Sequence, residues 1–253
     1  MAGPCSVETE AQLMATARHV RRWGARILRG GAFKPRSSPY SFQGHGLEGL
    51  RMLARARAEC GLAIVTEVMS ECDVPMVAEY ADILQIGSRS MENYSLLEAA
   101  ARSGRPILLK RGMVATVADF LHSAQVILEN GNPHVILCER GIRTFDTALR
   151  NTFDAGAIAL LKHVSHLPVI ADPSHAAGHR ELVPALARIA VAAGADGLLV
   201  EVHPNPGKAW SDGEQSLDFP EFCAMMTSLK PYLALRPPTL REPADARLME
   251  AVG

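Results

Sequence analysis

Long apolar runs and export signals are both missing from this sequence. In its 253 residues no apolar run approaches the roughly 18 residues that span a membrane. The opening residues, Met-Ala-Gly-Pro-Cys, lack the charged and the apolar segment of a secretion signal. These absences favour a cytoplasmic protein with no membrane partner.

Cysteine is scarce and shows no pairing pattern. The five cysteines form no Cys-x-x-Cys pair, and their number is odd. This pattern argues against a disulfide framework and against a structural zinc knuckle. We therefore expect reduced thiols.

The chain also has little net charge. Its formal charge of -1 gives no overall attraction to nucleic acid or to acidic membranes, so any anion must be bound by a local arrangement of cations. A hydrophobic content of 48% is enough for a full-sized core. We predict one catalytic domain over residues 1–235, followed by a proline-bearing C-terminal tail over residues 236–253.

Short apolar runs alternate with segments of helical length. Continuous apolar strands divided by helices indicate a parallel sheet, and eight such units close most naturally into a (β/α)8 TIM barrel. An open doubly wound sheet is the alternative. Only four residues precede Cys5, whereas a strand usually takes about 5 or 6, so we expect a truncated first strand. The other predicted strands are residues 26–28, 63–68, 83–86, 106–109, 135–138, 168–171 and 197–200.

Cationic residues follow most of the predicted strands. In a barrel, residues just past the strand ends line the active site, so these charges would converge on one mouth. Arginine forks and lysine point charges together suit a multiply anionic substrate. Solvated surface charges are the alternative, but positions beside Gly and Pro at apolar strand ends favour a site. The candidates are Arg29, Lys34, Arg36, Arg89, Lys110, Arg140 and Arg143.

Residues of metal-binding type stand in turns that contain Pro or Gly. They are Cys5, His175, Glu201 and Asp212, and one thiolate, one imidazole and two carboxylates suit a divalent transition metal. Ligands this scattered are a weak pattern, because each alone is more often a core or surface residue. The barrel strengthens the hypothesis, since it brings the ends of strands 1, 7 and 8 together.

Two further residues have open interpretations. His203 lies two residues beyond Glu201 and so on the same side of an extended chain, where it would act as an acid or base or support a ligand. An ordinary loop histidine is the alternative. Glu67 ends an apolar run and should point into the mouth, either to orient Lys110 or a reacting water or simply to pair with the cations.

Taken together, these motifs resemble the 3-deoxy-D-arabino-heptulosonate 7-phosphate (DAHP) synthase family in its short type I form, which opens the shikimate pathway. The resemblance runs from Ala2 to about Leu229. So many matches in the same order are highly specific. The matching segments are residues 2–6, 30–36, 85–87, 108–112, 138–145, 172–175, 201–204 and 211–213.

The resemblance implies a role for each candidate. Cys5, His175, Glu201 and Asp212 would hold a divalent ion such as Mn, Co, Fe or Zn. Lys110 and Glu67 would manage protons, with His175 and Cys5 contributing to catalysis. Phosphoenolpyruvate would be bound by Arg29, Lys34, Gly87, Ser88, Arg89, Lys110 and Arg140, and the phosphate of erythrose 4-phosphate by Arg36 and Ser37, with His203 as a further binding residue. The family also implies a homodimer or homotetramer.

Two other functions stay open. The related octulosonate 8-phosphate synthases use arabinose 5-phosphate and typically carry an extra Asn segment between the Lys and Arg of this loop; the direct Lys34-Pro35-Arg36 sequence favours the four-carbon sugar. A barrel that binds phosphoenolpyruvate without turnover and serves as a partner subunit is the second alternative. Ser37, Ser88 and Glu92 depart from the usual family residues.

Overall fold

A computed structural model describes residues 1–34, 40 and 42–234 of the chain. Arg36, Ser37 and the predicted tail over residues 236–253 lie outside these described residues.

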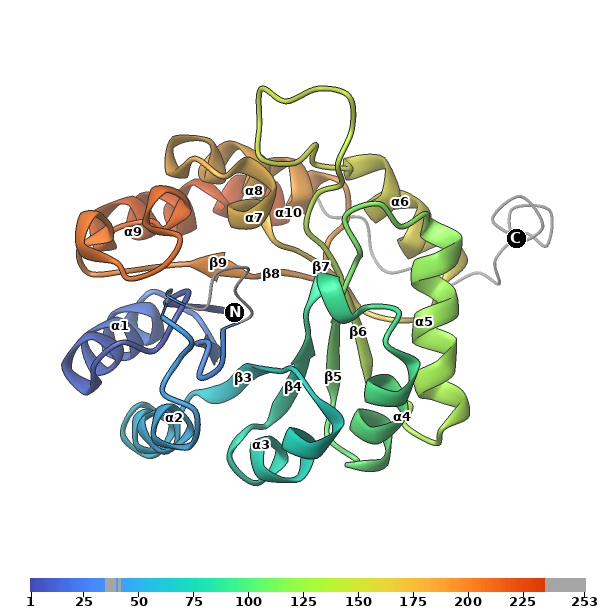
Figure 1. Cartoon of the computed structure of the whole chain (residues 1–253). Helices are drawn as coiled ribbons and strands as arrows, with labels where there is room; N and C mark the ends of the chain where they lie inside the picture. The colour runs from blue at the N-terminus through green and yellow to red at the C-terminus, as the bar shows by residue number, and fades with distance from the viewer. Residues whose placement is uncertain (35–39, 41, 235–253) are drawn as a thin grey trace.

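The strands form one parallel sheet with the order β8-β7-β6-β5-β4-β3-β2-β1-β9 (Figure 1). From β1 to β8 each strand pairs with its neighbours in sequence, as expected for strands joined by crossover connections, and β9 pairs with β1. The strands are β1 (Ala2–Gly3), β2 (Ile27–Arg29), β3 (Ala63–Val68), β4 (Ile83–Ile86), β5 (Ile107–Lys110), β6 (Val135–Glu139), β7 (Val169–Ala171), β8 (Gly197–Leu198) and β9 (Val200–Glu201).

β8 and β9 are two parts of one barrel strand, separated only by Leu199. The Leu199 N–H donates to the carbonyl of Ala171 at 2.8 Å, and the next N–H, of Val200, donates to the carbonyl of Met1 at 3.0 Å. The strand thus changes partner from β7 to β1 and brings the sheet back to its start. The predicted (β/α)8 barrel is confirmed.

The first strand is short, as predicted, but it pairs on both sides. Ala2 lies opposite Leu28 of β2 and opposite Val200 of β9. Gly3 has a φ of +154°, and a Cβ at this position would lie 2.1 Å from the carbonyl oxygen of Arg29. Glycine at position 3 therefore permits β1 to lie close to β2. The two residues of β1 in this way fix the start of the loop that carries Cys5.

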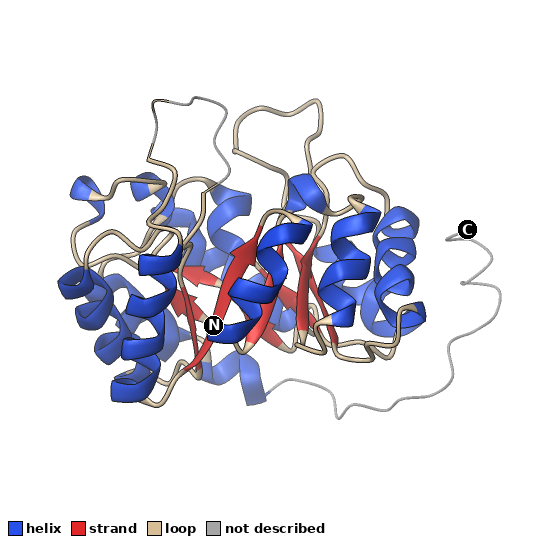
Figure 2. Cartoon of the chain, turned by 60° about the horizontal axis from the view of Figure 1, so that its bottom comes forward, coloured by secondary structure: helices blue, strands red, loops and turns tan. Residues whose placement is uncertain are grey.

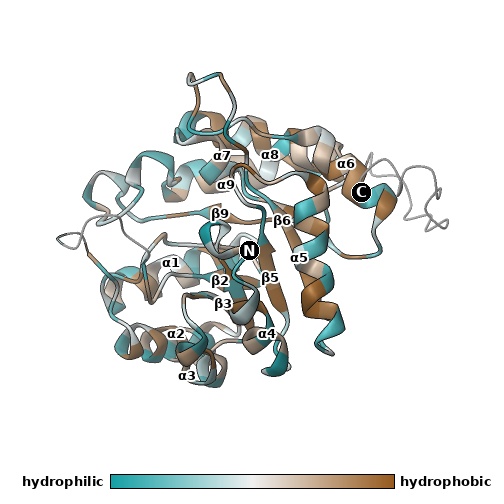
Figure 3. Ribbon diagram, turned by 45° about the vertical axis from the view of Figure 1, so that its right-hand side comes forward, coloured by the Kyte–Doolittle hydropathy of each residue, from teal (hydrophilic) through white to brown (hydrophobic). Residues whose placement is uncertain are grey.

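Helices surround the strands on the outside of the barrel (Figure 2). Helix α5 begins with a capping box formed by Thr116 and Asp119. Figure 3 shows hydrophobic and hydrophilic residues alternating along it. The α-helices are α1 (Glu10–Arg22), α2 (Leu47–Cys60), α3 (Val74–Tyr80), α4 (Tyr94–Arg102), α5 (Val117–Glu129), α6 (Ala155–Val164), α7 (Pro173–Ala177), α8 (Val183–Ala192), α9 (Phe219–Ser228) and α10 (Lys230–Ala234). Single 3₁₀ turns are η1 (Glu71–Asp73), η2 (Ser88–Ser90), η3 (Arg180–Leu182), η4 (Pro206–Lys208) and η5 (Gly213–Gln215). Among the described helices, none is long and apolar enough to cross a membrane.

The barrel interior changes from apolar to polar along each strand. Val65, Ile83, Leu108, Cys138, Ile170 and Leu199 form a buried cluster separate from the larger core between strands and helices. Because side chains alternate along a strand, the next residue on the same face lies two positions further. These next residues are polar and meet at the mouth: Glu67, Gln85, Lys110, Arg140, Asp172 and Glu201, with Arg29 two positions after Ile27 on β2.

Candidate active site

The mouth of the barrel holds a cavity of about 200 Å³. Seven lysine and arginine side chains line it, against the carboxylates of Glu67 and Asp212. Such an excess of positive charge favours an anionic ligand. Six of the predicted cations lie on this wall, and Arg36 lies outside the described residues. The lining residues are Arg29, Lys34, Glu67, Gln85, Gly87, Ser88, Arg89, Lys110, Met113, Arg140, Arg143, Arg150, Asn151, His175 and Asp212.

Asp172 orients two predicted site residues at once. The ammonium of Lys110 donates to its Oδ2 at 2.5 Å, and Nδ1 of His175 lies 2.7 Å from the same oxygen without hydrogen-bond alignment. Oδ1 accepts the backbone N–H of His175 at 3.0 Å and so caps the short helix α7. Burial would raise the pKa of Asp172, but His175 and Lys110 hold it well below its ordinary value.

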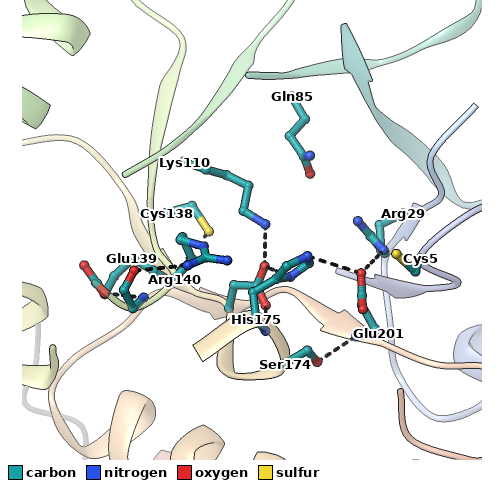
Figure 4. A network of polar contacts seen from close by, with 12 residues as sticks. Cys5, Arg29, Gln85, Lys110, Cys138, Glu139, Arg140, Ser174, His175 and Glu201 are labelled. Carbon is teal, nitrogen blue, oxygen red and sulfur yellow. Dashed lines mark hydrogen bonds and ion pairs between the residues drawn. The ribbon is translucent and has the colours of Figure 1, made fainter. Parts of the chain in front are cut away.

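Glu201 is bonded through both carboxylate oxygens. Arg29 donates to Oε1 at 2.6 Å, and Gln215 donates to Oε2 at 2.6 Å. Figure 4 shows His175 between this carboxylate and Lys110, with its Nε2 3.6 Å from Oε1. Burial alone would raise the pKa of Glu201, but His175 and Arg29 lower it, so the carboxylate is ionised.

Cys5 lies beside Asp212 at the end of the first strand. Its Sγ donates to Asp212 Oδ2 at 2.9 Å and accepts from Lys34 Nζ at 2.9 Å. Burial, together with the charge of Glu201, raises the pKa of the thiol to about 12. Asp212 is the one described non-glycine residue with a positive φ, 49°, a strained conformation that recurs at functional sites.

The donor set at this point fits a divalent metal ion. Cys5 Sγ and carboxylate oxygens of Glu201 and Asp212 lie within 4.8 Å of one another. Two ionised carboxylates and a thiol gathered in a buried place are costly without a cation and match the ligand preferences of transition metals. His175, the fourth predicted ligand, approaches Glu201 but is not within 4.8 Å of the whole group.

Glu67 and Gly87 are in close contact across two strands. A Cβ at Gly87 would lie 2.0 Å from Oε1 of Glu67, so only glycine leaves room for this carboxylate. Gln85 donates to the other oxygen, Oε2, at 3.3 Å. Glu67 on β3 thus contacts the start of the loop after the adjacent strand β4, and it lines the cavity at the mouth, where the sequence placed it.

Two of the cavity arginines have unused hydrogen-bond donors. Nε of Arg29 and Nε of Arg140 are buried, and neither has a partner in the described part of the chain. Arg140 donates from Nη1 only to the Gly141 carbonyl, at 3.3 Å, and burial lowers its pKa. A buried guanidinium without an anion is unfavourable, so this position is suited to a bound phosphate or carboxylate.

The structure differs from the sequence prediction at the edges of the site. His203 is not among the residues that line the cavity, because both of its ring nitrogens are bonded elsewhere in the protein. Gln85 and Asp172 were missed, although each stands two residues after an inward apolar residue of its strand, a signal that would have found them. Arg150 and Asn151, on the long loop after β6, carry no such signal.

This architecture defines a class of protein: a (β/α)8 barrel whose strand ends gather cations suited to an anion, next to a thiol and carboxylate group suited to a metal ion. Comparison with known proteins narrows the class. Residues 1–234 match the DAHP synthetase I family, so the chain belongs to that family and is an enzyme of the transferase class. The family resemblance noted in the sequence is confirmed.

Individual relatives agree with this membership. The phospho-2-dehydro-3-deoxyheptonate aldolase of Thermotoga maritima is 53% identical over 230 residues, which cover 91% of this chain and 68% of the relative. The crystal structure of the Thermotoga maritima DAHP synthase has a TM-score of 0.89 at 52% identity, with the same two coverages of 91% and 68%. The 2-dehydro-3-deoxyphosphooctonate aldolase of Acidithiobacillus ferrooxidans is more distant, at 37% identity over 84% of this chain and 81% of the relative.

Proposed function

We propose that this protein condenses phosphoenolpyruvate with erythrose 4-phosphate, with the help of a divalent metal ion, to give DAHP and phosphate. The observation that carries the proposal is the contact between two sites. A cavity lined by seven cations includes Asp212 of the candidate metal site in its wall, and Asp212 accepts a hydrogen bond from the buried Cys5 at 2.9 Å. Two anionic substrates and a cation fit this pair of sites together.

Phosphoenolpyruvate carries a phosphate and a carboxylate, and the cavity offers separate donors for each. Arg89, Lys110 and Arg140, with the backbone near Gly87 and Ser88, form one wall. Arg29 and Lys34 form the opposite wall beside the metal site. Arginine forks hold planar anions in a fixed orientation, which places the methylene carbon of phosphoenolpyruvate for reaction.

Cys5, Glu201 and Asp212, with His175, would hold the metal ion, and it would supply Lewis acidity for the reacting aldehyde. The methylene carbon of phosphoenolpyruvate then attacks the aldehyde carbon, and the new carbon–carbon bond forms. Water adds to the cationic carbon left behind, loses a proton, and the carbon–oxygen bond to phosphate breaks. One water is consumed and one phosphate is released for each product molecule.

Proton movement falls to Lys110 and Glu67 in this proposal. The ammonium of Lys110 is fixed by Asp172 at 2.5 Å, inside the cavity and facing the cations. Glu67 lines the same cavity from β3, two strands away, and is packed on Gly87. An ammonium donor and a carboxylate acceptor in the wall of one cavity suit protonation of the alkoxide and deprotonation of the attacking water.

The sugar phosphate would bind at Arg36 and Ser37, which lie outside the described residues. The loop that carries them starts at Lys34, whose ammonium donates to Cys5 Sγ at 2.9 Å. The aldehyde end of a sugar bound by this loop would therefore lie toward the metal site.

Phosphate release from phosphoenolpyruvate, measured with either aldose, tests the assignment of the substrate. We expect turnover with erythrose 4-phosphate and at least 100-fold less with arabinose 5-phosphate. Preference for the five-carbon sugar would make the protein an octulosonate 8-phosphate synthase. Binding of phosphoenolpyruvate without turnover on either sugar would favour the non-catalytic subunit.

A further inference from the structure

Glu8 is a buried carboxylate that the proposed reaction does not use. It lies in the loop between β1 and α1, is only 6% exposed, and is absent from the lining of the main cavity. Its Oε1 accepts the backbone N–H of Trp210 at 2.8 Å, and its Oε2 lies 3.1 Å from Nε2 of His203. Its backbone carbonyl accepts a hydrogen bond from Nε2 of His45 at 2.7 Å. Glu8 belongs to the loop after β1, and it thus forms hydrogen bonds with both the loop after β2 and the loop after β9.

The hydrogen bonds of His203 fix its tautomer. The backbone N–H of Asn205 can only donate, and it lies 3.0 Å from Nδ1, so Nδ1 is the acceptor. The ring proton is therefore on Nε2 and points at Glu8. With both nitrogens bonded and the residue 5% exposed, His203 has no free nitrogen for a substrate.

The loop after β9 is held against the loop after β1 at two successive residues. Trp210 is bonded to Glu8, and the hydroxyl of Ser211 lies 2.8 Å from that of Ser6. The next residue of each loop toward the cavity belongs to the metal site, since Cys5 precedes Ser6 and Asp212 follows Ser211. The 2.9 Å contact between Cys5 and Asp212 stands directly beside these two attachments.

The Trp210 ring extends the same attachment to the loop after β2. It packs on Phe42 and His45, with ring centroids 4.9 Å and 6.0 Å away. The neighbouring carbonyl of Gln43 accepts the backbone N–H of Lys34 at 2.9 Å. The loop after β9, which carries Asp212, and the loop after β2, which carries Lys34, are therefore joined by the packing of the Trp210 ring.

We propose that Glu8 and His203 are a positioning pair that sets the place of Asp212 relative to Cys5, and that His203 acts through Glu8 rather than on a substrate. Asp212 needs such support, because its left-handed backbone is unfavourable for a residue with a side chain. Outer residues that orient metal ligands affect metal affinity strongly. The expected effect of the pair on metal affinity rests on the proposed function. Its expected effect on the position of the loop after β9 does not.

The test begins with the fluorescence of Trp210. The chain has two tryptophans, so Trp23→Phe leaves Trp210 as the single emitter. In this background, His203→Leu and Glu8→Ala remove the bonds of the pair, whereas His203→Gln keeps an N–H near the place of Nε2. His163→Leu and Glu10→Gln, both at exposed positions, are the matched controls.

We expect His203→Leu and Glu8→Ala to shift Trp210 emission to the red and to increase its quenching by acrylamide. Mn²⁺ affinity of the metal-free protein, measured by calorimetry, should fall about 10- to 100-fold in both variants. His203→Gln should stay within about threefold of the parent in Mn²⁺ affinity and keep the Trp210 emission. Where turnover is measurable, the His203→Gln variant should be at least tenfold more active than the His203→Leu variant.

Other results would overturn the positioning pair. One such result is a His203→Leu variant with unchanged Trp210 emission and Mn²⁺ affinity. Another is a His203→Gln variant that has normal fluorescence but loses turnover as fully as His203→Leu, because this loss is expected when the histidine itself acts as an acid or base. Should His203→Leu fail to fold, the same comparison is made between Glu8→Gln, which keeps a single acceptor oxygen, and the parent. A parent that binds no Mn²⁺ contradicts the proposed function instead, and the fluorescence still decides the role of the pair.

Discussion

The ammonium of Lys110 lies 2.5 Å from Oδ2 of Asp172, and both side chains are almost fully buried. The partners come from the ends of β5 and β7, which are separated by β6 in the barrel. Because Asp172 also faces His175, one carboxylate links the proposed substrate pocket to the proposed metal site.

Asp172→Asn should destabilise the protein and reduce activity. Asparagine still caps α7, but it leaves the Lys110 ammonium buried among other cations, and losing one partner of a buried pair costs about 3–5 kcal/mol. We expect that loss in the free energy of unfolding from urea denaturation. The double variant Lys110→Met, Asp172→Asn should be more stable than Asp172→Asn alone. Equal or lower stability of the double variant would show that the charge of Lys110 is not the cause.

Metal affinity should rise with pH through the ionisation of Cys5. Because the pKa of this thiol is raised to about 12, it is protonated at neutral pH and must lose its proton to bind a metal. The pKa values of Glu201, Asp212 and His175 are all lowered, so these ligands have no proton to release there. The Mn²⁺ association constant should therefore increase about tenfold for each pH unit between pH 6.5 and 8.5.

Calorimetry at several pH values measures that slope, and Cys5→Ala provides the reference. The variant should bind Mn²⁺ more weakly and without the pH dependence, while Cys72→Ala, at an exposed position, should behave as the parent. An affinity of the parent protein that does not change with pH would mean that the thiol is not a ligand.

Arg140→Met should stabilise the free protein and weaken phosphoenolpyruvate binding. The arginine is buried, its Nε has no partner in the described residues, and six other cations share its cavity. Replacing such a group with an apolar side chain should raise the free energy of unfolding by about 1 kcal/mol, which is about 2–4 °C in melting temperature. Phosphoenolpyruvate should then raise the melting temperature much less than in the parent. A variant that melts several degrees lower and keeps the full ligand shift would contradict this assignment.

Gly87→Ala should reduce turnover by displacing Glu67. The added Cβ would lie 2.0 Å from Oε1 of that carboxylate, so one of the two groups must move. We expect kcat/KM to fall about 100-fold, the usual size for a displaced acid or base. Gly156→Ala is the control, because its Cβ would meet only Asp154 Oδ1 at 3.4 Å. Equal activity of the two variants would argue against a role for Glu67.

The sequence predicted the barrel and most of the cavity wall for one physical reason. Each inward apolar residue is followed two positions later by a polar one, so residues such as Arg29, Glu67 and Lys110 stand out at strand ends. The loops follow no such period. Arg150 lines the cavity and donates to Asp212 at 3.1 Å from a long loop after β6, and the bonds of His203 depend on Glu8, far away in sequence.

Metal-assisted turnover at this mouth of the barrel is the central property proposed for the protein. The direct measurement is phosphate release from phosphoenolpyruvate and erythrose 4-phosphate by metal-free protein as Mn²⁺ is added, with Cys5→Ala alongside. We predict no release before the metal, saturating release as about one equivalent binds, and almost none in the variant. Full activity of the parent in the presence of a chelator, or of Cys5→Ala at low Mn²⁺, would contradict the account.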